Sequence, residues 1–352
     1  MISKLAKSLA PYVPGEQLND RRYIKLNTNE SPYPPSPAVK AALDAFDYRQ
    51  LRLYSDPEAA ELRAAIAEAN GVTPDMVMAG GGSDEILTCA FMAFFDAGDN
   101  IFYPDITYGF YPVLSRLFRL NPQTPPLDGA LRADIDDYMR ADGHIVTANP
   151  NAPTGIALAP SEIERVLAAD GSRLFIADEA YIDFTEGKSC APLLKKYDNL
   201  LIIRTYSKSH NLAGMRLGYA LGAPALTDAL RRVKNSFNPY NLDRVSIAAG
   251  AAAILDAPYL KKTASKIIKT REDTRLGLEK LGFEVLPSEA NFLFARREGI
   301  SGGQLYRTLR ENGVLVRYFD KPRVSDFIRI SIGTPADMSR VLEILKECEE
   351  YQ

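Results

Sequence analysis

The chain has 352 residues, of which 46% are hydrophobic and 25% charged, and its formal net charge is −3 at pH 7. This length exceeds what a single hydrophobic core usually supports, so one large and one smaller domain are expected. The small negative charge gives no reason to expect nucleic acid or an anionic membrane as a partner.

Cysteine and histidine usage argues against a metal site. The cysteines Cys89, Cys190 and Cys348 are far apart and lack metal-ligand spacing, so we interpret them as reduced thiols of a cytoplasmic protein. His144 and His210 are the only two histidines, which also argues against a histidine triad. We interpret His144 as structural, because it begins a predicted strand and lies away from the strand ends that carry chemistry.

Residues 1–30 are predicted to form an N-terminal arm that crosses to another part of the molecule. Lys4 and Lys7 are not followed by a sustained apolar segment, so neither a signal peptide nor a membrane anchor is expected. The arm leads into a polar stretch, 26–33, which is closed by a group of prolines. On composition alone this stretch is a rigid surface loop.

The segment 31–240 is predicted to be the large domain, and it begins with helices over 37–46 and 58–69. A strand over 76–79 then leads through a run of glycines into a helix that ends near residue 95. Glycines at such a turn let the backbone approach an anion, and the helix N-terminus supplies free N–H groups. The turn is a weak signal alone, but upstream of a cofactor lysine it predicts a phosphate site with Gly82, Ser83 and Asp84 as contacts.

Further strands are predicted over 99–103 and 144–148, and a helix over 161–169 follows them. Ser161 is expected to cap this helix, with Glu164 completing a capping box.

A short apolar run, 174–177, is predicted to be a buried strand that ends in Asp178 and Glu179. An acidic pair after a strand is often only a helix N-cap with a solvated acid. The next apolar run, 200–203, leads to Lys208. If the two strands are parallel neighbours, Asp178 lies beside Lys208 at the carboxyl edge of the sheet, where open α/β sheets bind ligands.

Lys208 is flanked by the hydroxyls of Thr205 and Ser207, and Arg216, which begins a predicted strand over 216–221, follows at a distance of eight residues. A lysine held among small polar groups at a strand end loses solvent, so its pKa falls and its amine becomes reactive. The hydroxyls and the guanidinium indicate a phosphate close to the amine. An amine beside a phosphate site is what pyridoxal phosphate requires. An ordinary surface lysine is the alternative.

Two side chains near Lys208 fit the same cofactor. A carboxylate at Asp178 keeps a pyridine nitrogen protonated, which makes the ring an electron sink. Tyr181 is placed to donate a hydrogen bond to the phenolic oxygen of the ring.

The composition shifts at 235–241, and we predict the domain boundary there, with 241–352 as a small α+β domain. Its start, 242–281, is predicted to be mostly helical. Arg329 lies within an otherwise apolar strand, where an unpaired charge is costly, and Arg317 lies at a strand end. The predicted strands are 291–295, 314–318 and 327–332, with one helix between the first two and another at the end.

Three motifs together resemble the fold-type I aminotransferases, in particular their histidinol-phosphate aminotransferase branch. The motifs are Asp178-Glu179-Ala180-Tyr181, Thr205-Tyr206-Ser207-Lys208 and Leu212-Ala213-Gly214-Met215-Arg216. The resemblance extends over 26–333 and implies a mostly parallel seven-stranded sheet flanked by helices, with pyridoxal 5'-phosphate as cofactor. The chain departs from the family at His210 and Asn211, where the family usually has an aromatic or aliphatic residue and then a small one.

The resemblance also assigns cofactor ligands outside these motifs. Tyr108 resembles the family's stacking residue, and in a chain without tryptophan some other aromatic side chain must cover the ring. The loop 149–155 is specific to the family, and it presents Asn151 to the phenolic oxygen. Tyr54 looks like the tyrosine that reaches the cofactor phosphate of the partner subunit, which implies a homodimer. For Tyr54 and Tyr108 a buried structural tyrosine is the alternative.

The substrate is expected to contact Asn151 and three further residues of the family pattern. Asn29 lies in a stretch that borders the substrate pocket, Arg329 corresponds to the arginine for the substrate carboxylate, and Arg317 is suited to a substrate phosphate. A structural arginine in a salt bridge is the alternative in both cases.

The resemblance implies a reaction as well. L-histidinol phosphate and 2-oxoglutarate are converted to imidazole-acetol phosphate and L-glutamate, a step of histidine biosynthesis. Lys208 forms a Schiff base with the cofactor, then acts as general base and acid, and the kinetics are ping-pong.

Four other functions are weighed against this one. An aromatic amino acid aminotransferase shares most motifs, although Arg317 argues against it, and a phosphothreonine decarboxylase also remains open. A non-catalytic protein that binds the cofactor is disfavoured by the intact Lys208 and Asp178. A nucleotide-binding dehydrogenase is disfavoured because the glycines at 80–82 lack the spacing of the dinucleotide motif.

Overall fold

The computed structural model describes residues 1–18 and 23–347, so Cys348 lies outside the described residues. A large unit is built on a seven-stranded sheet and a small unit on a four-stranded sheet. The prediction of an α/β fold with a mostly parallel sheet and a smaller α+β domain is thereby confirmed. Within the described residues no helix is long and apolar enough to cross a membrane.

The large sheet is parallel except at one position. Strand β8 runs antiparallel to both of its neighbours, β2 and β7, while the remaining pairs are parallel. The strands in spatial order are β2 (Val77–Gly80), β8 (Gly218–Gly222), β7 (Leu200–Thr205), β6 (Phe175–Asp178), β5 (His144–Ala148), β3 (Asn100–Phe102) and β4 (Asn121–Gln123).

Helices cover both faces of this sheet, which explains why its central strands are apolar without alternation. In β7, Leu200 and Ile202 pack into one core cluster, and Leu201 and Ile203 pack into another. The first face is covered by α2 (Pro37–Ala45), α3 (Ala60–Asn70), α6 (Ile135–Met139), α7 (Pro160–Ala169) and α9 (Arg244–Leu255), and the second by α4 (Ser83–Phe94), α5 (Phe110–Phe118) and α8 (Pro224–Phe237).

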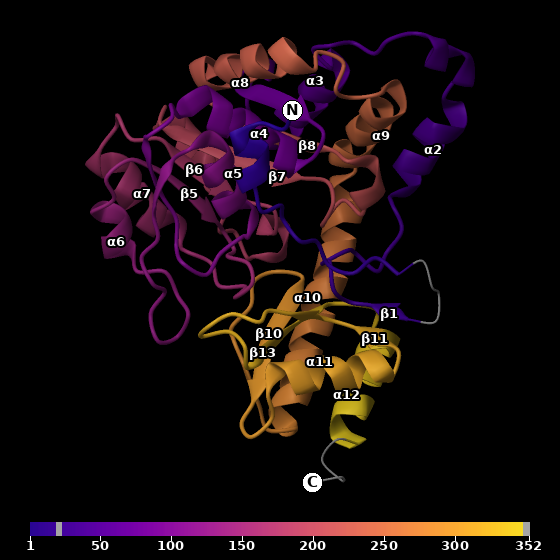
Figure 1. The fold of residues 1–352 in the computed structure, drawn as a ribbon. Coiled ribbons are helices and arrows are strands. Elements are labelled where there is room, and N and C mark those ends of the chain that lie inside the picture. The colour runs from indigo at the N-terminus through magenta and orange to yellow at the C-terminus, as the bar shows by residue number, and fades with distance from the viewer. Residues whose placement is uncertain (19–22, 348–352) are drawn as a thin grey trace.

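The small unit is an antiparallel sheet with helices packed against it. Its strands follow the order β12 (Arg317–Tyr318), β13 (Phe327–Ser331), β10 (Phe292–Arg297) and β9 (Phe283–Val285). The helices are α10 (Ala257–Lys280), α11 (Gly302–Glu311) and α12 (Pro335–Glu347), and in Figure 1 α10 runs from the large unit down into the small one.

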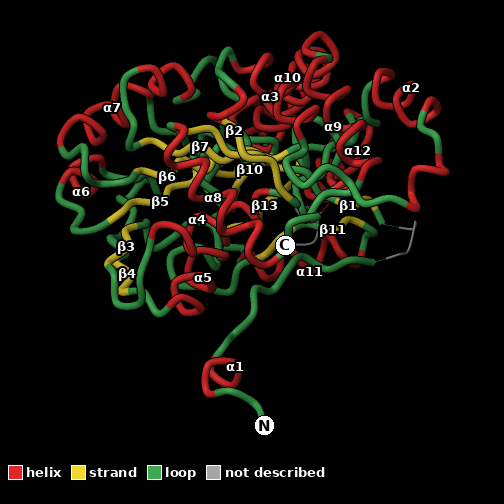
Figure 2. Tube along the Cα trace, turned by 90° about the horizontal axis from the view of Figure 1, so that it is seen from above, coloured by secondary structure: helices red, strands yellow, loops and turns green. Residues whose placement is uncertain are grey.

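The N-terminal arm joins the small unit instead of the large one. Strand β1 (Ile24–Lys25) pairs in parallel with β11 (Val314–Leu315), and Leu26 packs into the core of the small unit. Figure 2 shows α1 (Lys4–Ser8) projecting away from the rest of the chain. The segment between α1 and β1 therefore carries the arm across the molecule.

Several predicted boundaries differ from the structure. The domain boundary was predicted at 240, but the following helix α9 packs on α2 and α3 of the large unit. The large unit therefore extends to Asp256, between α9 and α10. The predicted strand over 314–318 is divided into β11 and β12, which belong to different sheets. Arg216 precedes β8 instead of beginning it, because its φ of 51° is incompatible with a strand.

The predicted capping box of α7 was wrong by two residues. The helix begins with Pro160, and the Glu162 carboxylate accepts a hydrogen bond from the Ala159 N–H at 2.7 Å. Proline favours the first helical position because its missing N–H is not needed there. Glu164 instead accepts from Lys196 and Tyr197.

Gly218 provides the first test of this architecture. A Cβ at this position would lie 2.6 Å from the carbonyl carbon of Gly82 and 2.7 Å from the Ser83 nitrogen. Gly218→Ala is therefore expected to lower the free energy of unfolding by about 1–3 kcal/mol through overpacking, as measured by urea denaturation.

Gly171→Ala is the matched control for Gly218→Ala. A Cβ at Gly171 meets nothing within 4 Å, so its effect is expected to stay below about 1 kcal/mol. Equal stability of both variants and the wild type would contradict the close contact between β8 and the turn before α4.

Candidate active site at the carboxyl edge of the large sheet

One cavity of about 460 Å³ brings most of the predicted site residues together. It lies where β6 and β7 end, between the N-terminus of α4 and the small unit, and its size suits a small-molecule ligand. The predicted residues that line it are Asn29, Ser83, Asp84, Tyr108, Asp178, Tyr181, Thr205, Ser207, Lys208, Arg216, Arg317 and Arg329.

Lys208 presents its amine to this cavity. Burial, together with the nearby positive charge of Arg329, lowers the pKa of the amine to about 8. Nζ donates a hydrogen bond to the carbonyl oxygen of Thr28 at 3.0 Å. A substantial fraction of the amine is therefore neutral near physiological pH and available as a nucleophile.

Asp178 is the last residue of β6, paired in register with Ala148 on one side and Ile203 on the other. Its carboxylate accepts hydrogen bonds from the Tyr111 hydroxyl at 2.9 Å and from the Ala180 N–H at 3.2 Å. Burial raises its pKa to about 6, whereas the Tyr111 hydrogen bond opposes this shift. The group is mostly ionised at neutral pH, although burial makes the charge costly.

Tyr181 and Asn29 form a hydrogen-bonded pair beside the lysine. The Asn29 amide donates to the Tyr181 hydroxyl at 2.9 Å, and the Tyr181 ring centre lies 5.8 Å from Lys208 Nζ. Asn29 adopts a left-handed conformation with φ of 56°. Ser331 of β13 fixes it by accepting from its N–H and donating to its side-chain oxygen, at 2.9 and 3.0 Å.

The turn before α4 forms the anion-binding end of the cavity. Gly82 has a φ of 89°, and a Cβ there would lie 2.7 Å from Arg216 Nη2, so glycine lets the guanidinium approach the helix N-terminus. Arg216 Nη1 donates to the Ser207 hydroxyl at 3.3 Å, and Thr205 bonds to Ser207 at 3.0 Å. Two hydroxyls, a guanidinium and free helix N–H groups suit a phosphate.

Aromatic and acidic side chains stand beside this anion-binding end. The Tyr108 hydroxyl donates to Asp84 at 2.9 Å, and Asp84 lies 3.9 Å from the Arg216 guanidinium. The Tyr108 ring also lies 5.8 Å from that of Tyr12 in the arm, edge to face.

Arg329 lines the cavity from β13 of the small unit. It forms no ion pair within the described residues, its Nη2 donates to the Asn27 carbonyl at 3.1 Å, and its Nε is buried without a partner. Burial lowers its pKa from the usual value. A buried guanidinium with free donors is costly unless an anion completes it, so this position suits a carboxylate ligand.

Arg317 also lines the cavity but is engaged by the arm. Its guanidinium donates to the carbonyl oxygens of Pro14 and Val13 at 3.0 and 2.9 Å, and its register partner across the sheet is Arg329. An anion bound by Arg317 must therefore share or replace these backbone acceptors.

Three of the predicted site residues do not line the cavity: Gly82, whose turn is described above, Asn151 and Tyr54. The Asn151 amide donates to the carbonyl of Ile106 at 3.0 Å and to Thr154 at 3.1 Å, while Ala152 lines the cavity in its place. Tyr54 is 76% exposed and stacks on Tyr240 at 4.4 Å between ring centres. The alternative of a buried core tyrosine is therefore wrong for Tyr54.

Several lining residues were not anticipated from the sequence. Tyr12 and Gln17 reach the cavity from the arm, and Phe319 reaches it from the end of β12. Tyr111, which supports Asp178, lies on an apolar helix and carries no motif. The arm residues line the cavity because β1 pairs with β11 and so holds the end of the arm on the small unit.

His210, one of the departures from the family pattern, is packed behind Lys208. It is 7% exposed, its ring lies 4.7 Å from that of Tyr206, and burial lowers its pKa. His144 likewise has a structural role, because its Nδ1 accepts from the Leu174 N–H at 3.1 Å.

A second cleft, of about 600 Å³, lies between the units on another side. Its charges are largely paired with one another: Lys188 with Glu289 at 2.6 Å, and Arg275 with Glu272 and Glu279 at 2.9 and 2.6 Å. The cleft therefore offers no isolated charge comparable to Arg329, and we do not assign it a ligand.

Comparison with known proteins gives consistent matches over nearly the whole chain. The family described as aminotransferase class I and II matches residues 21–345. A histidinol-phosphate aminotransferase of Brachyspira hyodysenteriae is 48% identical over 98% of each chain. Another, of Gluconacetobacter diazotrophicus, is 50% identical over 94% of this chain and 93% of its own.

Solved structures agree with the sequence matches. The crystal structure of histidinol-phosphate aminotransferase from Sinorhizobium meliloti in complex with pyridoxal-5'-phosphate has a TM-score of 0.89 to this chain. It is 25% identical, and the match covers 99% of this chain and 98% of that one.

Asp178 provides a test of the electrostatics of the cavity. Because its pKa is raised from 3.8 to about 6 in the folded state, its ionised form destabilises the fold above pH 6, and this cost disappears below the unfolded pKa. Asp178→Asn is therefore expected to raise the thermal midpoint of the cofactor-free protein above pH 6 and to converge with the wild type near pH 4.

Tyr111→Phe is the companion variant, and it is expected to lower the thermal midpoint where Asp178→Asn raises it. The substitution removes a hydrogen bond that lowers the pKa of Asp178. The thermal midpoint of Tyr111→Phe is therefore expected to fall further below that of the wild type as pH rises. A difference between Asp178→Asn and the wild type that does not change with pH would contradict the raised pKa.

Proposed function

This chain belongs to the class I and II aminotransferases, and we propose that it transfers an amino group between L-histidinol phosphate and 2-oxoglutarate with pyridoxal phosphate as cofactor. The observation that carries the proposal is that the Lys208 amine, the buried Asp178 carboxylate and Arg329 converge on one cavity. Arg329 has no ion-pair partner among the described residues. The names of the relatives of 45–50% identity support the same reaction, a step of histidine biosynthesis.

The residues present fit the cofactor. Lys208 would hold it covalently, Asp178 would pair with its ring nitrogen, and Tyr181 would donate to its phenolic oxygen. The N-terminus of α4, together with Thr205, Ser207 and Arg216, would receive the phosphate, and Tyr108 would cover the ring. When bound, pyridoxal phosphate supplies an electron sink for the charge that develops at the substrate Cα.

The protein's own groups move the protons. The Lys208 amine, with a pKa of about 8, takes the proton from the substrate Cα and later returns a proton, acting as general base and then acid. Asp178 remains ionised when a positive ring nitrogen is next to it, because an opposite charge favours the carboxylate. Burial of both groups excludes water from the reacting atoms.

Substrate binding is assigned to the arginines of the small unit. We propose that Arg329 binds the α-carboxylate of glutamate and 2-oxoglutarate as a planar donor. Arg317 serves the phosphate of the other substrate, exchanging its backbone acceptors in the arm for phosphate oxygens. Asn29 connects the two ends of the site, because it bonds both to Tyr181 and to Ser331 beside Arg329. Asn151, which points away from the cavity, remains only a prediction as a ligand.

We further propose that the chain acts as a homodimer in the cytoplasm. Tyr54 belongs to a group of exposed apolar side chains, and burying such a group against a partner subunit is favourable. The exposed fractions are 76% for Tyr48, 60% for Leu51, 46% for Leu53 and 76% for Tyr54. A cytoplasmic location is supported by Cys89 and Cys190, which are free and buried.

The substrate assignment is tested with the colour of the reconstituted protein. Adding L-glutamate or L-histidinol phosphate is expected to bleach the absorbance of the lysine-bound cofactor, because each donates its amino group. L-phenylalanine, which lacks an anion for Arg317, is expected to act more slowly. A response to glutamate and phenylalanine without a response to histidinol phosphate would favour an aromatic amino acid aminotransferase and contradict the proposal.

The dimer is tested by mixing inactive chains. Tyr54→Ala and Lys208→Ala chains, unfolded and refolded together, are expected to recover activity, because a hybrid dimer has one site with an intact lysine and an intact partner tyrosine. The control pair, Lys208→Ala with Asp178→Asn, damages both sites of every hybrid and should recover nothing. Absence of recovery in the first mixture would rule out a site that shares Tyr54 across the interface.

A further inference from the structure

We propose that Asp183 and Ser209 form a clasp that positions Lys208 opposite Tyr181 and Asp178, an inference that rests on the proposed function. Ser209 directly follows the lysine, and Asp183 lies two residues after Tyr181. The Ser209 hydroxyl donates a hydrogen bond to Asp183 Oδ2. A single charge-assisted hydrogen bond thus connects the two chain segments that carry the reacting groups.

The clasp connects the two segments beyond the last residue pair of β6 and β7. The ladder between β6 and β7 ends with the pair Asp178 and Ile203, so Tyr181 and Lys208 both lie beyond it. Loop residues beyond a strand end have more freedom than residues in the ladder. A side-chain link at this point therefore limits how far the lysine amine moves relative to the Tyr181 hydroxyl.

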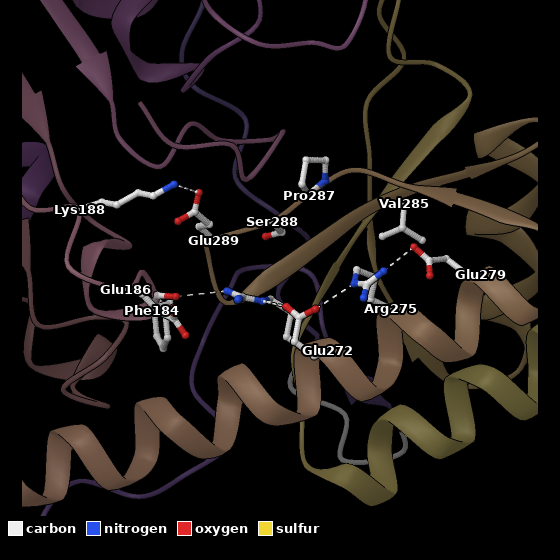
Figure 3. A pocket seen from close by; sticks show the side chains of 11 residues that line it. Phe184, Glu186, Lys188, Glu272, Arg275, Glu279, Val285, Pro287, Ser288 and Glu289 are labelled. Carbon is white, nitrogen blue, oxygen red and sulfur yellow. Dashed lines mark hydrogen bonds and ion pairs between the residues drawn. The ribbon is translucent and has the colours of Figure 1, made fainter. Parts of the chain in front are cut away.

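Both ends of the clasp are fixed by packing. Ser209 is 2% exposed. Asp183 belongs to the short 3-10 helix η3 (Ile182–Phe184), in which Ile182 and Phe184 are 4% and 1% exposed. Arg271 of α10 donates to the carbonyl oxygens of Phe184 and Ala290 at 3.3 and 2.9 Å, and Figure 3 shows Phe184 at the wall of the second cleft.

An ion pair beneath the clasp prevents the two segments from separating. Arg204 of β7 donates twice to Glu179 Oε2, at 2.8 and 3.0 Å, and the Glu179 side chain is completely buried. Glu179 directly follows Asp178. The ion pair fixes the strand ends, and the clasp then fixes the residues beyond them.

The proposal is tested with Ser209→Ala and Asp183→Ala in two measurements. In steady-state transfer from glutamate, kcat is expected to fall about tenfold or more with little change in KM, because a displaced lysine impairs the proton transfers but not substrate binding. In the cofactor-free protein, the pH dependence of Lys208 acetylation is expected to show an amine pKa above the wild-type value of about 8, because a less confined amine is better solvated.

Three further variants make the test specific. Ser209→Ala/Asp183→Ala is expected to be no slower than the worse single variant, because the two residues share one interaction. Asp183→Asn keeps an acceptor oxygen and should retain most of kcat, and it carries the test with Ser209→Ala if Asp183→Ala does not fold. Ser172→Ala is the matched control, because it removes an exposed bond to Asp170 of the same type, at 2.6 Å, and should change nothing.

Two results would overturn the clasp: single variants with wild-type kcat and amine pKa, or kcat losses that multiply in the double variant. Either result in a protein whose wild type transfers the amino group from glutamate counts against the clasp alone. A wild type that gives no transfer from glutamate counts against the proposed function instead.

Discussion

The site depends on burying a lysine amine close to Arg329. An amine with an ordinary pKa would be almost fully protonated at neutral pH and unable to attack or to accept a proton. Burial and the neighbouring Arg329 bring its pKa to about 8, and both causes require the small unit to pack against the large one at this cavity. The rest of the fold can be understood as the scaffold that closes this cavity.

The same burial imposes a cost on the folded protein. Asp178 is kept charged in a place where its pKa rises to about 6, and Arg329 is kept without a counter-ion among the described residues. Under the proposed function, both groups become paired when a cofactor nitrogen and a substrate anion bind. Without bound ligands, these groups therefore lower the stability of the folded protein, as is common at functional sites.

Much of this arrangement could be predicted from the sequence, because its strongest signals are local. The apolar runs before Asp178 and Lys208 showed two buried strands, and parallel pairing placed their ends at one edge. The direction of the Asn151 amide could not be predicted, because it depends on Thr154 and Ile106 within a folded loop. The roles of Tyr12 and Tyr111 were missed for a related reason: they depend on tertiary packing and leave no pattern in the chain.

Domain boundaries were also less predictable than strands. Helix α9 follows the change in composition near 240 but packs on the large unit, and the arm joins the small one.

The most direct test of the central claim is to add pyridoxal phosphate, reduce the complex with borohydride and identify the modified peptide by mass spectrometry. The structure predicts one pyridoxyl group, on Lys208. Modification of another lysine, or none after reconstitution, would contradict the assignment of this cavity as the active site.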